Sequence, residues 1–282
     1  MPYNAQITRD NPTCLIFLID RSSSMGKPFG RQPDKQKAAG VAEILNDLLY
    51  NLTIQCAKGG GIYDYLHLGI IGYGREVESA FGGALAGRKL VTVGDLGNNP
   101  LEIQDHESIE KDFAGREVRK IKKRPVWIRP MAGGNTPLAE AFTMATERIK
   151  EFLAAYPRCF PPLVLNLTDG RPTTDPRPQA KSLCNLGSND GKVLLFNLHL
   201  SEQNDPPIEF PSNENLLTDK FAKFLFRMSS ILPPKCVEAA RATGLHVEPQ
   251  SRGFVYNADF VSMHKFLDFG TKTQQVNSSY PT

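Results

Sequence analysis

Three short segments of this chain carry oxygen-bearing side chains that could together hold a hard metal cation. The first is the run Asp20-Arg21-Ser22-Ser23-Ser24, which directly follows an apolar stretch. Alternation along an extended turn allows the first and third serines of the run to face the same point. Mg²⁺ prefers oxygen ligands in octahedral geometry and keeps some of its water. Asp20, Ser22 and Ser24 are therefore candidate metal ligands.

The other two segments lie far along the chain, and each carries a side chain with an oxygen that could bind a metal. One is a glycine turn, Gly133-Gly134-Asn135-Thr136, and the other is the apolar run 162–167 followed by Thr-Asp-Gly, which contains Asp169. Ligands of an open α/β sheet bind outside the carboxyl ends of its strands. We therefore expect the oxygens of three loops to converge on one cation, and the set is Asp20, Ser22, Ser24, Thr136 and Asp169.

Each of these residues also has an ordinary structural explanation. Thr136 precedes Pro137 and could cap a helix, while Asp20 and Asp169 could cap turns. For any one residue the two interpretations are about equally good. The presence of all five, in order and on the expected elements, favours the metal site.

In this order the residues resemble the metal-ion-dependent adhesion site (MIDAS) of the von Willebrand factor A (vWA) family. That pattern is Asp-x-Ser-x-Ser, then a loop Thr, then an Asp in Thr-Asp-Gly, and the surrounding hydrophobic pattern is similar over residues 13–270. The run Thr-Asp-Gly-Arg-Pro-Thr-Thr-Asp at 168–175 resembles stand-alone bacterial members, including those associated with tellurite resistance.

The resemblance implies how such a site works. Ser22, Ser24 and Thr136 would contact Mg²⁺ directly, with Mn²⁺ or Ca²⁺ as alternatives. Asp20 and Asp169 would act mainly through bound water, or one of them would move to the metal when the ligand leaves. An Asp or Glu of a partner protein would complete the coordination. The resemblance also implies a regulator or scaffold in a bacterial stress or defence system, with a kinase, phosphatase or ATPase as a candidate partner.

Composition is that of a globular protein without a polyelectrolyte partner. The chain has 282 residues, a net charge of +3 and five scattered cysteines without a Cys-x-x-Cys pair. An odd number of cysteines without this spacing argues against a disulfide framework and against a zinc site. The polar start lacks a secretory signal, and no apolar stretch reaches the roughly 20 residues of a membrane span. We expect a cytoplasmic protein that does not bind membranes.

Strand and helix patterns alternate, which predicts a Rossmann-like, doubly wound and mostly parallel α/β sheet with helices on both faces. Strands are expected at 14–19, 66–73, 77–81, 163–167, 193–200 and 253–256. Helices are expected at 34–52, 137–156, 176–184, 217–228, 235–243 and 260–269. Asp34 is the expected N-cap of the first helix.

This pattern predicts one vWA domain over residues 13–270, preceded by an N-terminal extension at 1–12. An elaborated segment at about 82–129 should contain short elements of its own. The polar residues 271–282 are expected to form a disordered tail.

Enzyme motifs are incomplete, so we expect no catalytic activity. A haloacid-dehalogenase-type phosphatase needs a second carboxylate where Ser22 stands, and no histidine has a partner at the spacing of a metal or hydrolase motif. Metal-assisted phosphate-ester hydrolysis remains an alternative. Nucleic-acid binding through the basic run 116–129 is a further alternative, but its one aromatic, Trp127, is expected on a strand at 126–128 and makes a poor stacking platform.

Overall fold

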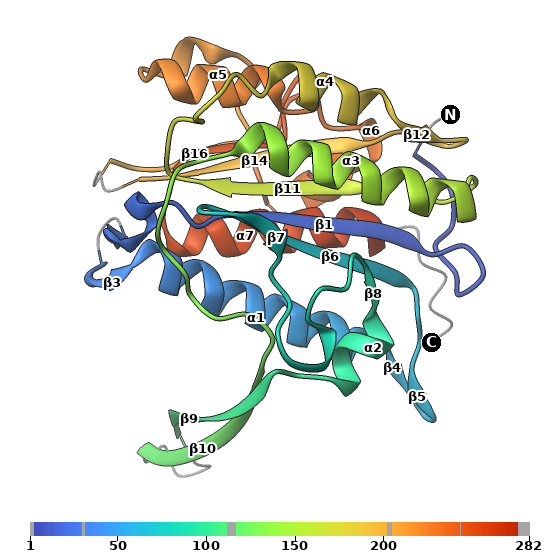
Figure 1. Ribbon diagram of the computed structural model, residues 1–282, viewed down its shortest axis with the longest axis vertical. Coiled ribbons are helices and arrows are strands. Elements are labelled where there is room, and N and C mark those ends of the chain that lie inside the picture. The colour runs from blue at the N-terminus through green and yellow to red at the C-terminus, as the bar shows by residue number, and fades with distance from the viewer. Residues whose placement is uncertain (1–2, 30–31, 112–116, 202–204, 243, 276–282) are drawn as a thin grey trace.

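A computed structural model describes residues 3–29, 32–111, 117–201, 205–242 and 244–275. Its centre is an eight-stranded sheet with the order β15-β16-β14-β11-β1-β6-β7, and β8 also pairs with β6 (Figure 1). The parallel strands are β1 (Thr13–Asp20), β6 (Leu66–Tyr73), β11 (Leu163–Thr168), β14 (Leu194–Leu200) and β16 (Phe254–Ala258). The antiparallel strands at the margins are β7 (Val77–Ser79), β8 (Val91–Thr92) and β15 (Ile208–Glu209).

Helices cover both faces of this sheet, as Figure 1 shows. One face carries α3 (Leu138–Ala155), α4 (Arg177–Asn185) and α5 (Lys220–Met228). The other carries α1 (Lys37–Cys56), α6 (Pro234–Ala242) and α7 (Phe260–Gln275), with α2 (Val93–Asn98) beside α1. The Rossmann-like α/β fold predicted from the sequence is therefore confirmed.

β1 shows why the central strands are apolar almost throughout. Leu15 and Phe17 pack into the core that α1 and α7 cover, whereas Ile16 and Leu18 pack into the core beneath α3. Successive side chains of a strand point to opposite faces, and both faces are buried here. The strand is therefore fixed in place by both layers, and its carboxyl end holds Asp20 firmly.

The start of the first helix differs from the prediction. Residues Gln32–Gln36 form β3, which pairs with β2 (Pro28–Phe29), and α1 begins only at Lys37. Asp34 lies within β3 and is not the N-cap; that position belongs to Gln36, which makes no side-chain cap hydrogen bond. Pairing with β2 keeps the backbone extended through Gln36, so the helix cannot begin earlier.

The end of the last helix also differs. α7 continues to Gln275, so residues 271–275 are helical and are not part of a disordered tail. The rest of that predicted tail, 276–282, lies outside the described residues. None of the helices in the described ranges is both long and apolar enough to cross a bilayer.

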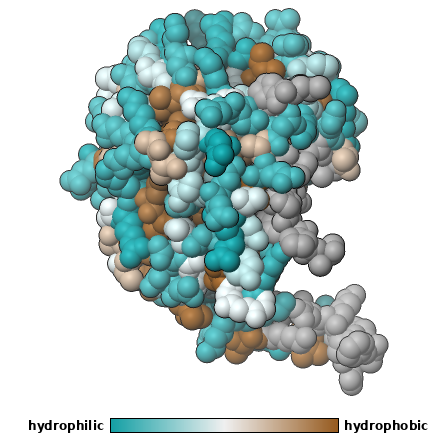
Figure 2. Space-filling model, turned by 90° about the vertical axis from the view of Figure 1, so that its right-hand side faces the viewer, coloured by the Kyte–Doolittle hydropathy of each residue, from teal (hydrophilic) through white to brown (hydrophobic). Residues whose placement is uncertain are grey.

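The segment 82–129 contains the 3₁₀ helix η2 (Gly83–Leu85), β8 and α2, and then a two-stranded arm. The arm consists of β9 (Glu102–Lys111) and β10 (Glu117–Val126), and it projects from the body in Figures 1 and 2. Smaller elements elsewhere are η1 (Ser23–Gly26), η3 (Glu214–Leu216) and the hairpins β4–β5 (Ala57–Lys58, Gly61–Ile62) and β12–β13 (Gly187–Ser188, Gly191–Lys192).

In the structure, acidic residues lie beside basic side chains of the run 116–129. Lys123 lies opposite Asp105 in the register, and Arg124 forms an ion pair of 2.9 Å with Asp47 of α1. Trp127 lies beyond the end of β10 and is only 2% exposed, so the strand predicted at 126–128 ends at Val126. An indole that is buried in the core cannot stack on a nucleic-acid base, which weakens the nucleic-acid alternative further.

Asn46 of α1 fixes the chain between this arm and the glycine turn. Its Oδ1 accepts the backbone N–H groups of Trp127 and Ile128 at 2.8 and 3.2 Å, and its Nδ2 donates to the carbonyl of Ile128 at 3.0 Å. All three residues are buried. The segment that leads to Thr136 therefore starts from a fixed point in the core.

Candidate metal centre

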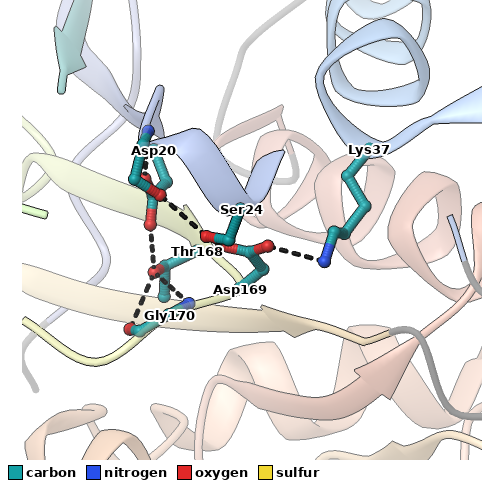
Figure 3. A network of polar contacts seen from close by, with 7 residues as sticks. Asp20, Ser24, Lys37, Thr168, Asp169 and Gly170 are labelled. Carbon is teal, nitrogen blue, oxygen red and sulfur yellow. Dashed lines mark hydrogen bonds and ion pairs between the residues drawn. The ribbon is translucent and has the colours of Figure 1, made fainter. Parts of the chain in front are cut away.

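Four of the predicted ligands lie at or just beyond the carboxyl ends of the neighbouring strands β1 and β11, and Figure 3 shows Asp20, Ser24 and Asp169 among them. The fifth, Thr136, follows the glycine turn and directly precedes Pro137 and α3. β1 ends at Asp20, and the chain then turns through η1; β11 ends at Thr168, and Asp169 follows. In the sheet, β6 lies on the far side of β1 and β14 lies on the far side of β11. The chain continues from β1 to β6 and from β11 to β14, so the two connections diverge between β1 and β11. Such a divergence opens the crevice where ligands bind to doubly wound sheets.

The hydroxyl groups of the site form a cluster around Asp169. The Oγ atoms of Ser22 and Ser24 are 3.0 Å apart, and Ser24 Oγ donates to Asp169 Oδ1 at 2.7 Å. A Cβ placed on Gly170 would lie 3.5 Å from Ser24 Oγ and also 3.5 Å from Thr136 Oγ1. These two hydroxyls therefore flank one point, and the structure brings the predicted residues of all three loops together.

Thr136 does not cap the helix that follows it. α3 begins at Leu138, its N-cap is Pro137, and the cap makes no side-chain hydrogen bond. Instead, the backbone of Thr136 is held by Thr173, which accepts from its N–H through Oγ1 at 3.1 Å and donates its own N–H to the Thr136 carbonyl at 2.9 Å. The capping explanation for Thr136 is wrong, which leaves its hydroxyl available for another role.

The glycine turn is fastened to the loop after β1. Gly133 donates its N–H to the Arg21 carbonyl at 2.6 Å, and Ser23 donates its N–H to the Gly134 carbonyl at 3.1 Å. Gly134 has φ +92°, and a Cβ there would lie 2.5 Å from the backbone nitrogen of Arg75. Only glycine fits this close approach of two backbones.

Asp20 is a fully buried carboxylate held by neutral donors. Its Oδ1 accepts the Ser22 N–H at 2.8 Å and its Oδ2 accepts the Thr168 hydroxyl at 2.6 Å, so it does also fix the turn. Burial raises the pKa of Asp20 to about 6, these hydrogen bonds oppose the shift, and the nearby charge of Asp169 adds to it. A cation at this place would favour the ionised carboxylate.

Asp169 carries a neighbour that the sequence did not indicate. Lys37, the first residue of α1, places its Nζ 2.6 Å from Asp169 Oδ2, and the two side chains are 2% and 1% exposed (Figure 3). No spacing rule connects positions 37 and 169, so sequence reasoning missed this pair. Thr168 was missed as well, although its place directly before Asp169 at a strand end was a usable signal.

The donor set fits a hard divalent cation. Three hydroxyls and two carboxylates supply oxygen alone, which suits Mg²⁺, Mn²⁺ or Ca²⁺. Throughout the described ranges, no three His, Cys, Asp or Glu side chains gather in a way that could hold a metal ion. A metal centre in this part of the chain would therefore depend on hydroxyl ligands, and Asp20 supplies a buried charge that such a cation would neutralise.

His199 lies beside the site on β14, paired in register with Thr168. Its ring stacks on Tyr256 with centroids 5.1 Å apart and meets Phe221 edge-on at 5.8 Å. Burial lowers the pKa of His199 to about 4, and the ammonium of Lys37 contributes to the lowering. His199 is therefore neutral at physiological pH and adds no charge to the site.

The depressed pKa of His199 predicts a pH-dependent loss of stability. The unfolded chain takes up a proton near the ordinary value of about 6.5 and the folded chain only near 4, so stability falls as the pH falls through this window. Between about pH 7 and about pH 4.5, His199 should remove about 2 to 3 kcal/mol of unfolding free energy.

Urea unfolding of the wild type and of His199→Phe, in EDTA and at both pH values, measures this contribution of His199 to the unfolding free energy. The stability difference between the two proteins should change by that amount in favour of His199→Phe at the lower pH. An identical pH dependence in both proteins would contradict the assignment.

No family model and no curated protein matches this chain. Similar solved structures include the PilB minor pilin from Streptococcus sanguinis, with 9% identity, a TM-score of 0.50, and coverage of 100% of this chain and 65% of that one. A von Willebrand factor type A protein from Catenulispora acidiphila has 13% identity, a TM-score of 0.45, and coverage of 94% and 42%. The manganese-loaded Plasmodium vivax TRAP protein has 14% identity, a TM-score of 0.44, and coverage of 92% and 74%.

The fold is the Rossmann-like, mostly parallel α/β sheet with helices on both faces that the sequence predicts. The strand predicted at 77–81 is present as β7, which ends at Ser79 and pairs with β6 in antiparallel orientation. The chain spans less than half the length of the Catenulispora protein and 48% of proximal thread matrix protein 1 from the mussel byssus. These likenesses concern the fold and carry no activity over to this chain.

Proposed function

We propose that this chain is a metal-dependent protein-binding module. A divalent cation, Mg²⁺ or alternatively Mn²⁺ or Ca²⁺, is held by the five residues predicted from the sequence, and an Asp or Glu of a partner protein completes its coordination. The observation that carries the proposal is the convergence of three loops. Ser24 Oγ of the first loop contacts Asp169 Oδ1 at 2.7 Å, and a Cβ on Gly170 would lie 3.5 Å from both Ser24 Oγ and Thr136 Oγ1.

Each residue has a role that follows from its contacts. Ser22, Ser24 and Thr136 would hold the cation through neutral oxygens, which leave its charge intact. Asp20 orients the first loop through the Ser22 N–H and fixes β11 through the Thr168 hydroxyl. When bound, the cation supplies a positive charge that attracts a carboxylate. Protein hydroxyls are weak ligands, so the cation would retain strong affinity for that additional anionic ligand.

A hollow beside the metal loops offers room for a partner segment. It has a volume of about 360 Å³, and its lining residues are Arg21, Gly74, Arg75, Glu76, Glu78, Met131, Ala132 and Gly133. Met131 is 51% exposed. A partner that presents an acidic side chain to the cation could therefore place a neighbouring residue in this hollow.

By resemblance of the run 168–175, we further propose a scaffold or regulator in a bacterial stress or defence system, of the tellurite-resistance-associated type. Scattered cysteines without a Cys-x-x-Cys pair support the proposal that it acts in the cytoplasm. A kinase, phosphatase or ATPase of that system would then be the partner. We also propose that the chain is not an enzyme. Generic phosphate esters should show no turnover with Mg²⁺, and metal-dependent hydrolysis that Asp20→Ala abolishes would support the phosphohydrolase alternative instead.

The experiment is a binding assay with a partner purified by affinity capture from the native cell. Binding should require Mg²⁺, should be lost in EDTA and in Ser22→Ala, and should be lost when one acidic residue of the partner is replaced by its amide. Ser79→Ala is the matched control, because its hydroxyl donates to the Arg88 carbonyl at 2.9 Å and is not in the cluster. Binding that persists unchanged in EDTA would contradict the proposed function.

A further inference from the structure

Lys37 is buried to a degree that is unusual for a lysine. Its side chain is 2% exposed, and it is the first residue of α1. Its backbone N–H donates to the Lys27 carbonyl at 3.0 Å. Lysine is almost never fully buried unless it is paired. Its ammonium lies 2.6 Å from Asp169 Oδ2 (Figure 3), so a positive charge is built into the candidate metal site.

The carboxylate of Asp169 serves two different neighbours through its two oxygens. Oδ2 faces Lys37, while Oδ1 accepts a hydrogen bond from Ser24 Oγ, which belongs to the hydroxyl cluster. The ammonium therefore contacts the oxygen that does not face the serines. A cation among the hydroxyls and the ammonium of Lys37 can be bound by one carboxylate at the same time.

Among the described residues, the charged groups considered at the site are the carboxylates of Asp20 and Asp169 and the ammonium of Lys37. Arg21, the basic residue nearest in sequence to Asp20, is directed elsewhere, with Nη1 3.1 Å from Glu78 Oε1. With Lys37 in place, the net charge is one negative without a metal and one positive with a divalent cation. Without Lys37, the corresponding values would be two negative and zero.

We propose, resting on the function proposed above, that Lys37 is the counter-charge of this metal centre and tunes it for an anionic partner group. By cancelling the charge of Asp169, Lys37 leaves the metal-loaded centre with a net positive charge. Like charges at close range repel, so the same lysine weakens binding of the metal itself. Lys37 thus lowers the affinity of the site for the metal alone and raises the affinity of the metal-loaded site for an acidic partner.

The test measures Mn²⁺ affinity by titration calorimetry in the wild type, Lys37→Met and Lys37→Arg. Removal of the positive charge should tighten Mn²⁺ binding by about tenfold or more, whereas Lys37→Arg should stay within about threefold of the wild type. Without metal, Lys37→Met should melt below the wild type, because Asp169 loses its counter-charge, and Mn²⁺ should raise its melting temperature more than it raises that of the wild type.

A purely structural ion pair would give a different pattern. Lys37→Met would then melt at a lower temperature than the wild type, yet it would bind Mn²⁺ with unchanged or weaker affinity. That result overturns the inference about Lys37. The proposed function stays intact as long as the wild type binds Mn²⁺. Lys37→Gln is the second variant if Lys37→Met does not fold, because its amide can still donate to Asp169 Oδ2 without a charge.

Two further outcomes separate the inference from the proposed function. If Lys37→Met binds Mn²⁺ and the wild type does not, Lys37 opposes metal binding as inferred, but a metal-dependent function of the native chain is overturned. The absence of Mn²⁺ binding from the wild type and from both uncharged variants overturns the proposed function and the inference together.

Discussion

Replacing Asp20 with Asn is expected to abolish stabilisation by Mg²⁺ and, in EDTA near pH 7, to make the protein more stable than the wild type. Burial raises the pKa of Asp20 to about 6, above its ordinary value of 3.8. The folded chain therefore holds this proton more tightly than the unfolded chain, and stability falls as the pH rises from about 4 to about 6. Above that window the ionised carboxylate costs about 3 kcal/mol in the absence of a cation.

The amide removes this charge and can keep both hydrogen bonds of Asp20. Its oxygen can still accept the Ser22 N–H, and its Nδ2 can donate to Thr168 Oγ1, whose own proton can then turn to the Gly170 carbonyl at 3.3 Å. Urea unfolding of both proteins in EDTA and in Mg²⁺ measures the effect. A variant that is destabilised in EDTA and still gains stability from Mg²⁺ would show that Asp20 is not a charged member of a metal centre.

Gly134→Ala is expected to have the largest structural effect on the site. A Cβ at this position would lie 2.5 Å from the backbone nitrogen of Arg75, and φ of +92° is already unfavourable for alanine. Because the conflict is with backbone, a side-chain movement cannot relieve it, and the turn that carries Thr136 must shift. We expect a loss of about 2 to 4 kcal/mol of unfolding free energy and at least about tenfold weaker Mn²⁺ binding.

Gly59→Ala provides the matched control, because a Cβ there would meet nothing within 4 Å. This control should change neither the unfolding free energy nor Mn²⁺ affinity by a measurable amount. Mn²⁺ affinity that survives in Gly134→Ala would indicate that the position of Thr136 is not important for the metal.

The central strands and the place of the site could be predicted from the sequence because both depend on local patterns. Strands that are buried on both faces are nearly continuous apolar runs, as in β1, and a carboxylate at the end of such a run falls on the ligand-binding edge of the sheet. Asp20 and Asp169 therefore came together as expected. The glycine turn before Thr136 was recognisable for the same local reason.

The features that the sequence did not reveal depend on contacts between distant segments. Pairing of β3 with β2 delays the start of α1 to Lys37 and thereby places its ammonium against Asp169, 132 positions further along the chain. The backbone N–H of the buried Trp127 donates at 2.8 Å to Asn46, which belongs to another element. Neither contact leaves a periodic or spacing signal, so the counter-charge at the site could only be found in the structure.

A crystal structure of the protein with Mn²⁺, analysed through the anomalous signal of the metal, tests the central claim most directly. One anomalous peak should lie among the hydroxyl oxygens of Ser22, Ser24 and Thr136, at about 2.1 to 2.2 Å from those that bind it, with a coordination position open towards the surface. No peak there at saturating Mn²⁺, or a further protein atom that permanently fills the open position, would contradict the metal-dependent binding function.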